Sequence, residues 1–349
     1  MRIGHELGPT ARRSPVTRDA DAFWVLSPGV GAIRPATIPE PGPDEVVVRT
    51  LHSAISRGTE SLVFRGGVPE SERVRMRAPF QDGDFPGPVK YGYLNVGLVE
   101  EGPRRLRGRT VFCLFPHQTR YVVPAAAVTL VPDDVPAARA VLAGTLETAI
   151  NLAWDAQPWI GQRIAVVGAG MVGACVARLL AGIPGTEVTL VDVDPERSGV
   201  AEGLGVGFAL PGAAPTGCDL VVHASATSAG LQLGLDLLAP EGTVWDLSWY
   251  GERPVSLTLG GSFHSGRLAI RASQVGTIPS TQRSGRTFAD RLALALRLLR
   301  DPAYDVILTD RSPFTELPAV LSDIAAGRRP GLCHVIDYGS ESVSRDRSR

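Results

Sequence analysis

The clearest fold signal in the chain lies in residues 163–192, which read RIAVVGAGMVGACVARLLAGIPGTEVTLVD. The segment begins with a short β-branched run, which is typical of a buried parallel strand. A turn of the form G-x-G-x-x-G follows, and apolar residues then recur at helical spacing until Gly182. A second apolar run ends in Asp192. The pattern predicts a strand, a glycine turn, a helix and a second parallel strand.

The glycines of this turn suit a dinucleotide-binding βαβ unit. Gly168 allows the tight turn, Gly170 lets a pyrophosphate approach the backbone, and Gly173 lets the helix pack closely on the strand. The free N–H groups at the start of the helix, at Met171 and Val172, would then face the phosphates. The alternative is a glycine-rich helix start that binds no nucleotide, and the complete βαβ context argues against it.

An acidic residue stands at the end of the second strand. Asp192 follows Gly173 by about 20 residues, the spacing of a carboxylate that accepts hydrogen bonds from the ribose hydroxyls of NAD. A 2′-phosphate would meet a like charge there, so the sequence favours NAD over NADP. Arg197 argues slightly the other way, because a basic residue shortly after the acid can lie along the adenosine edge.

The composition limits the classes of partner. The chain has 349 residues, 44% of them hydrophobic, and a net charge of −1. The length predicts about two domains, and the near-neutral charge disfavours binding to nucleic acid or an anionic membrane. No apolar run reaches about 18 residues, and the polar N-terminus has no signal-peptide core.

The cysteines point to a reducing compartment. Scattered through apolar runs, they predict buried free thiols in a cytoplasmic protein. No CxxC pair exists, so cysteines cannot form a structural zinc lobe. The four cysteines are Cys113, Cys175, Cys218 and Cys333.

The order of elements predicts an α/β protein. Residues 1–21 suggest a flexible lead-in, and short strands between Pro and Gly turns predict a β-rich domain over residues 22–145. Repeated strand–helix units predict a doubly wound parallel sheet over residues 146–280. Residues 281–339 form a mixed segment, and residues 340–349 suggest a disordered tail.

This order resembles the medium-chain dehydrogenase/reductase superfamily, which includes the zinc alcohol dehydrogenases, from about Phe23 to Tyr338. Residues 55–60 (ISRGTE) stand where the family has a C-G-T-D motif, and residues 91–97 (YGYLNVG) where it has G-H-E-x-x-G. Residues 224–226 (ASA) follow a predicted strand, where the family often has A-S-G near the nicotinamide. Ser225 is therefore a cofactor-binding candidate.

The resemblance also implies how the domains are used. Residues 22–145 would form a GroES-like catalytic domain, and residues 146–280 a Rossmann domain that binds NAD. Residues 281–339 would return to complete the catalytic domain. Thr148, at the junction of the domains, could contact the nicotinamide. The S-R-G-T-E motif and the tyrosine in place of a histidine are most similar to the bacteriochlorophyllide hydroxyethyl dehydrogenase group. This similarity does not imply a pigment as the substrate.

The zinc ligands of the family are replaced in this sequence. Arg57, or Ser56 in another alignment, stands at the cysteine position, and Tyr93 stands at the histidine position. Catalytic zinc needs about three protein ligands, so we expect no catalytic metal. The alternative is an unusual site assembled from three remaining candidates, Glu60, His117 and Glu147.

Without zinc, another group must hold the substrate oxygen. Tyr93 is the first candidate, with Lys90 expected to lower its pKa; alternatively, Tyr93 only fills the vacated metal cavity. Thr59 matches the family's proton-relay hydroxyl, or is a turn residue. Glu60 is a candidate base, but a structural ion pair with Arg57 is favoured. His117 is a base or a structural histidine.

These residues predict an NAD(H)-dependent, zinc-independent oxidoreductase that interconverts a hydroxyl and a carbonyl on a small polar substrate. A sugar, a cyclitol or a biosynthetic intermediate would fit, and a homodimer is the simplest assembly for the family. One alternative is an NAD(P)H-dependent reductase of an activated C=C bond. Another is a non-catalytic dinucleotide sensor. His52 and His223 lie in predicted strands and are expected to be core or edge residues.

Overall fold

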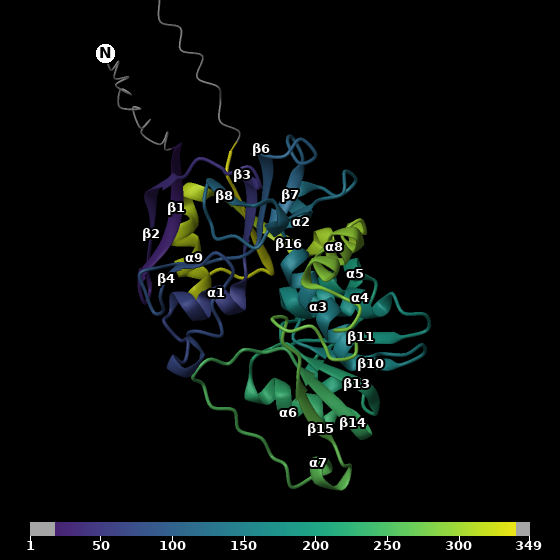
Figure 1. Cartoon of the computed structure of the whole chain (residues 1–349). Helices are drawn as coiled ribbons and strands as arrows, with labels where there is room; N and C mark the ends of the chain where they lie inside the picture. Colours follow the sequence, from purple (N-terminus) through teal and green to yellow (C-terminus); the bar gives the residue numbers. More distant parts are fainter. Residues whose placement is uncertain (1–17, 340–349) are drawn as a thin grey trace, which may run out of the picture.

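The computed structural model describes residues 18–339 and contains a parallel sheet beside a β-rich part of the chain (Figure 1). The parallel sheet has the order β12-β11-β10-β13-β14-β15, and each neighbouring pair runs parallel. Its strands are β10 (Arg163–Val167), β11 (Glu187–Val191), β12 (Gly207–Ala209), β13 (Cys218–His223), β14 (Leu238–Asp246) and β15 (Ala269–Ala272).

Helices cover both faces of this sheet, because the side chains of β10 alternate between two apolar clusters. Ile164 and Val166 pack with α3, α4, α5 and α8, whereas Ala165 and Val167 pack with α6. This arrangement confirms the predicted doubly wound fold. The helices are α3 (Ala143–Ala156), α4 (Met171–Ala181), α5 (Ser198–Leu204), α6 (Ser228–Asp236), α7 (Ser262–Ser265) and α8 (Phe288–Leu298).

The β-rich part is built around a long strand, β3 (Glu45–Ile55), which pairs antiparallel with three others. One of these partners is β17 (Cys333–Asp337), so the C-terminal segment returns to the N-terminal part of the chain. The other elements here are β1 (Arg18–Ser27), β2 (Val30–Ile38), β4 (Asp82–Gly83), β5 (Val89–Lys90), β6 (Asn95–Glu101), β7 (Thr110–Cys113), β8 (Arg120–Pro124), β9 (Val128–Leu130), β16 (Leu308–Pro313), α1 (Arg57–Phe64), α2 (Ala137–Ala140) and α9 (Leu317–Ala325).

Some predicted boundaries differ from the structure. β1 begins at Arg18, so the last residues of the predicted lead-in belong to a strand that pairs with β2 along its length. The predicted division between residues 145 and 146 falls inside α3, which begins at Ala143. Residues 1–17 and 340–349, which include the rest of the lead-in and the tail, lie outside the described residues. No helix within residues 18–339 is long and apolar enough to span a bilayer.

All four cysteines are free and buried, as predicted. Burial raises the pKa of the Cys113 and Cys333 thiols to about 12, and it also raises the pKa of Cys175 and Cys218. Because the thiolate is the reactive form, we expect Ellman's reagent at pH 8 to label the folded protein far more slowly than the denatured protein. Rapid labelling of one thiol in the folded state would contradict this buried arrangement.

Candidate active site

The glycine turn is shaped by close contacts on one side and open space on the other. Gly168 has a φ of +108°, and a Cβ there would lie 2.7 Å from the backbone N of Ser225. A Cβ on Gly173 would overlap the carbonyl oxygen of Gly168, so the helix packs directly on the turn. A Cβ on Gly170 would have nothing within 4 Å. The close contacts are therefore structural, whereas Gly170 borders space that a ligand can enter.

α4 begins at Met171 with Gly170 as its N-cap, and no side chain caps the helix. The backbone N–H groups of the first turn, which includes Met171 and Val172, have no intrahelical acceptor. Helix N-termini of this kind bind anions through these N–H groups and the helix dipole. The residues predicted to hold the pyrophosphate therefore lie where the local geometry suits a phosphate.

Asp192 braces the glycine turn. Its Oδ2 accepts from the backbone N of Ala169 at 2.7 Å, and its Oδ1 accepts from the backbone N of Asp194 at 3.0 Å. Arg197 lies 3.2 Å from the carboxylate of Asp194. Two carboxylates therefore stand at the end of β11, and the guanidinium of Arg197 is paired with the second of them.

Substitution of Gly170 by Ala tests whether a ligand enters the open side of this turn. Gly170 has an ordinary negative φ and free space at Cβ, so we expect the melting temperature to be nearly unchanged. We expect the Kd for NADH to rise about tenfold or more, equivalent to about 1.4 kcal/mol, because the methyl group occupies the path of the pyrophosphate. Gly199→Ala in α5 is the matched control, since its Cβ also meets open space. Unchanged NADH binding in the Gly170 variant would contradict the assigned site.

Tyr93 lies on the β-rich side of the site and donates a hydrogen bond from its hydroxyl to Ser56 Oγ at 2.7 Å. Burial, and next the nearby charge of Glu60, raise the pKa of Tyr93 to about 12, although hydrogen bonds with Ser56 and Thr59 oppose the shift. Tyr93 is therefore protonated at neutral pH and can act as a hydrogen-bond donor. Thr59 lies within hydrogen-bonding distance of Tyr93, and its role as a proton relay stays a prediction.

Glu60 does not pair with Arg57, which corrects the ion pair favoured from the sequence. The Oε2 atom of Glu60 lies 2.8 Å from Nε2 of His117, and its Oε1 accepts from the backbone N of Ser56 at 2.8 Å. Arg57 instead donates to the carbonyl oxygen of Arg329. The side chains of Glu60 and His117 are 3% and 1% exposed. The partner of Glu60 is therefore a buried histidine that the fold brings close, and not the nearby Arg57.

The chain of hydrogen bonds continues beyond His117. Its Nδ1 lies 2.7 Å from Ser53 Oγ, which lies 2.9 Å from the hydroxyl of Tyr338. Gly92, with a φ of +137°, allows the imidazole to approach, because a Cβ there would lie 2.9 Å from its Cδ2. The network places His117 between a carboxylate and a hydroxyl, the setting in which an imidazole transfers or holds a proton.

Lys90 does not have the expected effect on Tyr93. Its Nζ donates to Gln118 Oε1 at 2.9 Å and lies 3.7 Å from the carboxylate of Asp82. Burial lowers the pKa of Lys90 itself, and that of Tyr93 is raised rather than lowered. Lys90 therefore belongs to a separate polar group.

Glu147 forms an ion pair with Arg291, away from Glu60 and His117. Arg291 donates from Nε to Glu147 Oε1 at 3.0 Å, and its other nitrogens donate to Asn151 and to the carbonyl oxygen of Val275. Glu147 therefore does not join Glu60 and His117 as the sequence alternative required. Within residues 18–339, no three His, Cys, Asp or Glu side chains are grouped so that they could hold a metal ion. The residues present do not fit the zinc site of the resembling family.

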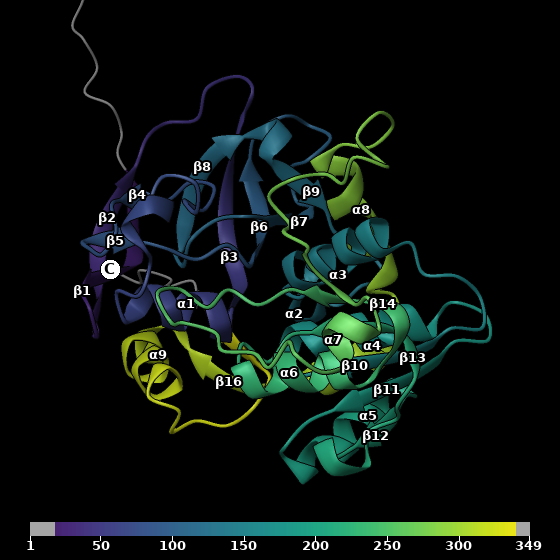
Figure 2. The same ribbon diagram turned by 90° about the horizontal axis from the view of Figure 1, so that it is seen from below.

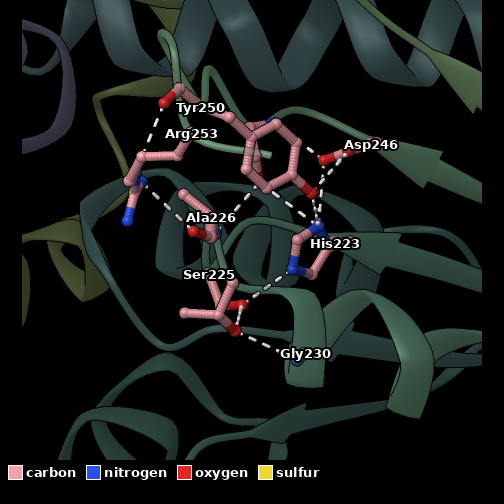
Figure 3. Close-up of polar contacts among 9 residues, drawn as sticks. His223, Ser225, Ala226, Gly230, Asp246, Tyr250 and Arg253 are labelled. Atoms are coloured by element: carbon pink, nitrogen blue, oxygen red, sulfur yellow. Dashed lines mark hydrogen bonds and ion pairs between the residues drawn. The ribbon is translucent and has the colours of Figure 1, made fainter. Parts of the chain in front are cut away.

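A further polar group at the ends of β13 and β14 was missed in the sequence. His223, predicted only as a core or edge residue, is fully buried, and its Nδ1 lies 2.9 Å from Asp246 Oδ1 (Figure 3). Its Nε2 lies 2.7 Å from the hydroxyl of Ser225, one of the predicted cofactor residues. The polar residue at the end of each parallel strand was the available signal, because such ends meet at one edge of a sheet.

Two other expectations concern Thr148 and His52. Thr148 donates to the carbonyl oxygen of Gly144 in its own helix, at 3.2 Å. His52 is partly buried, with its Nδ1 2.6 Å from Asp337 Oδ1. The contact between Thr148 and a nicotinamide therefore stays a prediction. His52 lies inside the sheet rather than at its edge, because β3 pairs there with β17 on one side and with β6 on the other.

Comparison with known proteins identifies the fold. No protein-family model and no curated protein matches the sequence. L-idonate 5-dehydrogenase from Escherichia coli K-12 is 14% identical with a TM-score of 0.75, covering 93% of this chain and 99% of that one. Galactitol-1-phosphate dehydrogenase from Escherichia coli is also 14% identical with a TM-score of 0.74, covering 91% and 100%. A short chain alcohol dehydrogenase from Escherichia coli CFT073, complexed with NADH, is 16% identical with a TM-score of 0.71, covering 92% and 99%. Over nearly its whole described length, the chain has the fold of alcohol- and polyol-type dehydrogenases.

Proposed function

We propose that the protein is an NAD(H)-dependent, zinc-independent oxidoreductase that interconverts a hydroxyl and a carbonyl on a small polar molecule. One observation carries the proposal: Tyr93 and the open glycine turn pack on one apolar cluster that joins the β-rich part of the chain to the parallel sheet. Tyr93 packs against the apolar cluster that contains Ala169 and Met171 of the turn and helix. Burial, and next the nearby positive charge of Arg197, lower the pKa of Arg57 at the start of α1. Arg57 in the β-rich part therefore lies close to Arg197, which follows β11.

The residues of the chain supply the polar part of this reaction. NAD, when bound at the glycine turn, would supply the acceptor for the hydride of the alcohol carbon, and the hydroxyl proton would pass to the buried Glu60–His117 pair. Tyr93, protonated at neutral pH, donates a hydrogen bond to the substrate oxygen and stabilises charge that develops on it. Because a tyrosine hydroxyl has one proton, Tyr93 would turn that proton from Ser56 Oγ to the substrate oxygen, and Ser56 and Thr59 would then donate hydrogen bonds to the Tyr93 oxygen. Glu60 and His117 form the buried acid–base pair behind it.

The preference for NAD rests on the carboxylates at the end of β11. A 2′-phosphate would stand near Asp192 and Asp194, and Arg197, which lies close to them, is already paired with Asp194. Repulsion between like charges therefore disfavours NADP. A candidate zinc-binding dehydrogenase from Sinorhizobium meliloti 1021 with this fold is bound to NADP, however, so the fold accommodates either cofactor.

Independence from zinc rests on the donors that are present. Tyr93 replaces a histidine ligand, both oxygens of Glu60 already accept hydrogen bonds, and Glu147 is paired with Arg291. We extend the proposal to a cytoplasmic homodimer acting on a sugar, a cyclitol or a biosynthetic intermediate. The buried free thiols support the cytoplasm, the family resemblance supports the dimer, and the polar side chains near Tyr93 and His117 support the substrate class. The names of two neighbours, an idonate and a galactitol-1-phosphate dehydrogenase, are consistent with this class.

A substrate screen tests the proposal. Purified protein is incubated with NAD and a panel of polyols, sugar acids and cyclitols, or with NADH and the matching ketones, and absorbance at 340 nm is followed. We expect turnover of at least one hydroxyl–carbonyl pair with NAD(H). A parallel panel of activated alkenes with NADPH covers the alternative: turnover there alone would replace the proposal with C=C reduction. Cofactor binding without turnover in either panel would favour the other alternative, a non-catalytic dinucleotide sensor.

A further inference from the structure

The polar group of His223 includes a loop that follows β14. Asp246, the last residue of β14, accepts from the backbone N of Ser248 at 2.9 Å and from the hydroxyl of Tyr250 at 2.9 Å (Figure 3). The same carboxylate holds His223, whose other nitrogen contacts Ser225. Hydrogen bonding to His223 and Ser248 helps to lower the pKa of Asp246 against the opposing effect of burial. Asp246 therefore links this loop to the turn that follows β13.

The turn after β13 contains a residue in an unfavourable backbone conformation. Ala226 has a φ of +53°, in the left-handed region where a Cβ is disfavoured. Its N–H donates to Ser248 Oγ at 3.1 Å, and its carbonyl oxygen accepts from Arg253 Nη2 at 3.3 Å. Such strain persists only where the surroundings fix it, and it concentrates at binding sites. Here the loop after β14 supplies both contacts.

The same loop reaches the β-rich part of the chain. Trp249 packs against the apolar cluster that contains Phe23, Val63 and Phe64. Gly251 has a φ of +64°, and a Cβ there would lie 2.6 Å from the carbonyl oxygen of Gly67. Figures 1 and 2 both show the green segment after β14 extending toward α1. The loop that holds Ala226 is therefore anchored on the β-rich part of the chain.

The position of the turn identifies the part of the ligand that it faces. The strand order reverses between β10 and β13, and ligands cross an open α/β sheet at such a switch point. Asp192 stands on the β11 side, where the adenosine is expected. Ser225 stands on the β13 side, against the backbone of Gly168. The turn at Ala226 therefore lies toward the nicotinamide half of a dinucleotide.

We propose that Ser248 and Arg253, supported by Tyr250 and the His223–Asp246 pair, are positioning residues that hold the Ala226 turn in the shape that binds the nicotinamide–ribose half of the cofactor. This inference rests on the proposed function, because it assumes a nicotinamide dinucleotide. It assigns the loop after β14 to cofactor recognition rather than to substrate binding. The adenosine half should be bound independently of this loop.

Calorimetric titration with NADH and with ADP separates these halves, because ADP lacks the nicotinamide and its ribose. In a Ser248→Ala/Arg253→Met double variant, we expect the Kd for NADH to rise about tenfold and that for ADP to change by less than about twofold. Adding Ala226→Gly should recover most of the loss, because glycine adopts positive φ readily. Arg297→Met, at an exposed position on α8, is the control.

The outcomes distinguish the two proposals. An equal loss of affinity for both ligands would show a general structural effect and overturn the positioning role. Unchanged NADH affinity in the double variant would overturn it while leaving the proposed function intact. If the unmodified protein binds neither ligand, the proposed function fails, and the inference fails with it.

Discussion

Replacement of Arg291 by Met is expected to lower the free energy of unfolding by about 3–5 kcal/mol, the range found when one partner of a buried ion pair is removed. Arg291 is 1% exposed and joins α8 to Glu147 and Asn151 on α3. Met fills a similar volume but leaves the carboxylate of Glu147 buried without its counter-charge. The loss should therefore come from an uncompensated charge rather than from a cavity.

The pH dependence of this loss follows from Glu147. Burial already raises its pKa, and the charge of Arg291 opposes that shift. Without Arg291 the pKa in the folded state rises further above the unfolded value, so the folded variant binds the proton more tightly. Stability is then lost as pH rises above the unfolded pKa, and the deficit should be larger at pH 8 than at pH 5.

Urea denaturation followed by circular dichroism at both pH values measures this effect. An Arg291→Met/Glu147→Gln double variant should regain a large part of the stability, because no charge then remains buried. A deficit below about 1 kcal/mol that does not change with pH would instead describe an ordinary surface pair, and the buried pair would be rejected.

Replacement of Tyr93 by Phe is expected to lower turnover about 10²- to 10³-fold, as removal of one donor from an oxyanion site does. The substrate would be one found in the screen, and NADH affinity should change little. Tyr91→Phe is the matched control, because Tyr91 is buried and lies next to Tyr93. The two rings are arranged edge to face, with their centroids 6.1 Å apart. Because the pKa of Tyr93 is about 12, its ionisation should not reduce activity below about pH 11.

The opposite result has a specific meaning. If Tyr93→Phe and the control have equal turnover, Tyr93 only fills the space that a metal ligand occupies in the resembling family. The hydroxyl would then serve Ser56 alone, and another donor would have to hold the substrate oxygen. Comparing the melting temperatures of both variants separates this outcome from a loss of folding.

The sequence predicted best those features that depend on nearby residues. The glycine turn, the flanking strands and the helix ending before Gly182 follow from local spacing, and the structure contains all of them. β2 (Val30–Ile38) was not predicted, because its burial pattern does not alternate and its place is set by pairing with β1. Tertiary pairing here outweighs local propensity.

The polar partners in the site were harder to predict. The sequence favoured Arg57 as the partner of Glu60, yet the partner is His117, far along the chain. The group around His223 likewise needs Asp246 and Tyr250 from another strand and loop. Such partners are brought together by the tertiary arrangement of strands, helices and loops, and a local pattern does not say which residues will pair.

The most direct test of the account is a fluorescence titration of the purified full-length protein with NADH and, separately, with NADPH. Zinc is measured by mass spectrometry on an untreated aliquot. We expect saturable NADH binding at least about tenfold tighter than NADPH binding, without stoichiometric zinc. Tighter NADPH binding would contradict the argument from Asp192, and stoichiometric zinc would contradict the proposed metal-independent site. Binding of neither nucleotide would contradict the central claim that the glycine turn holds a dinucleotide.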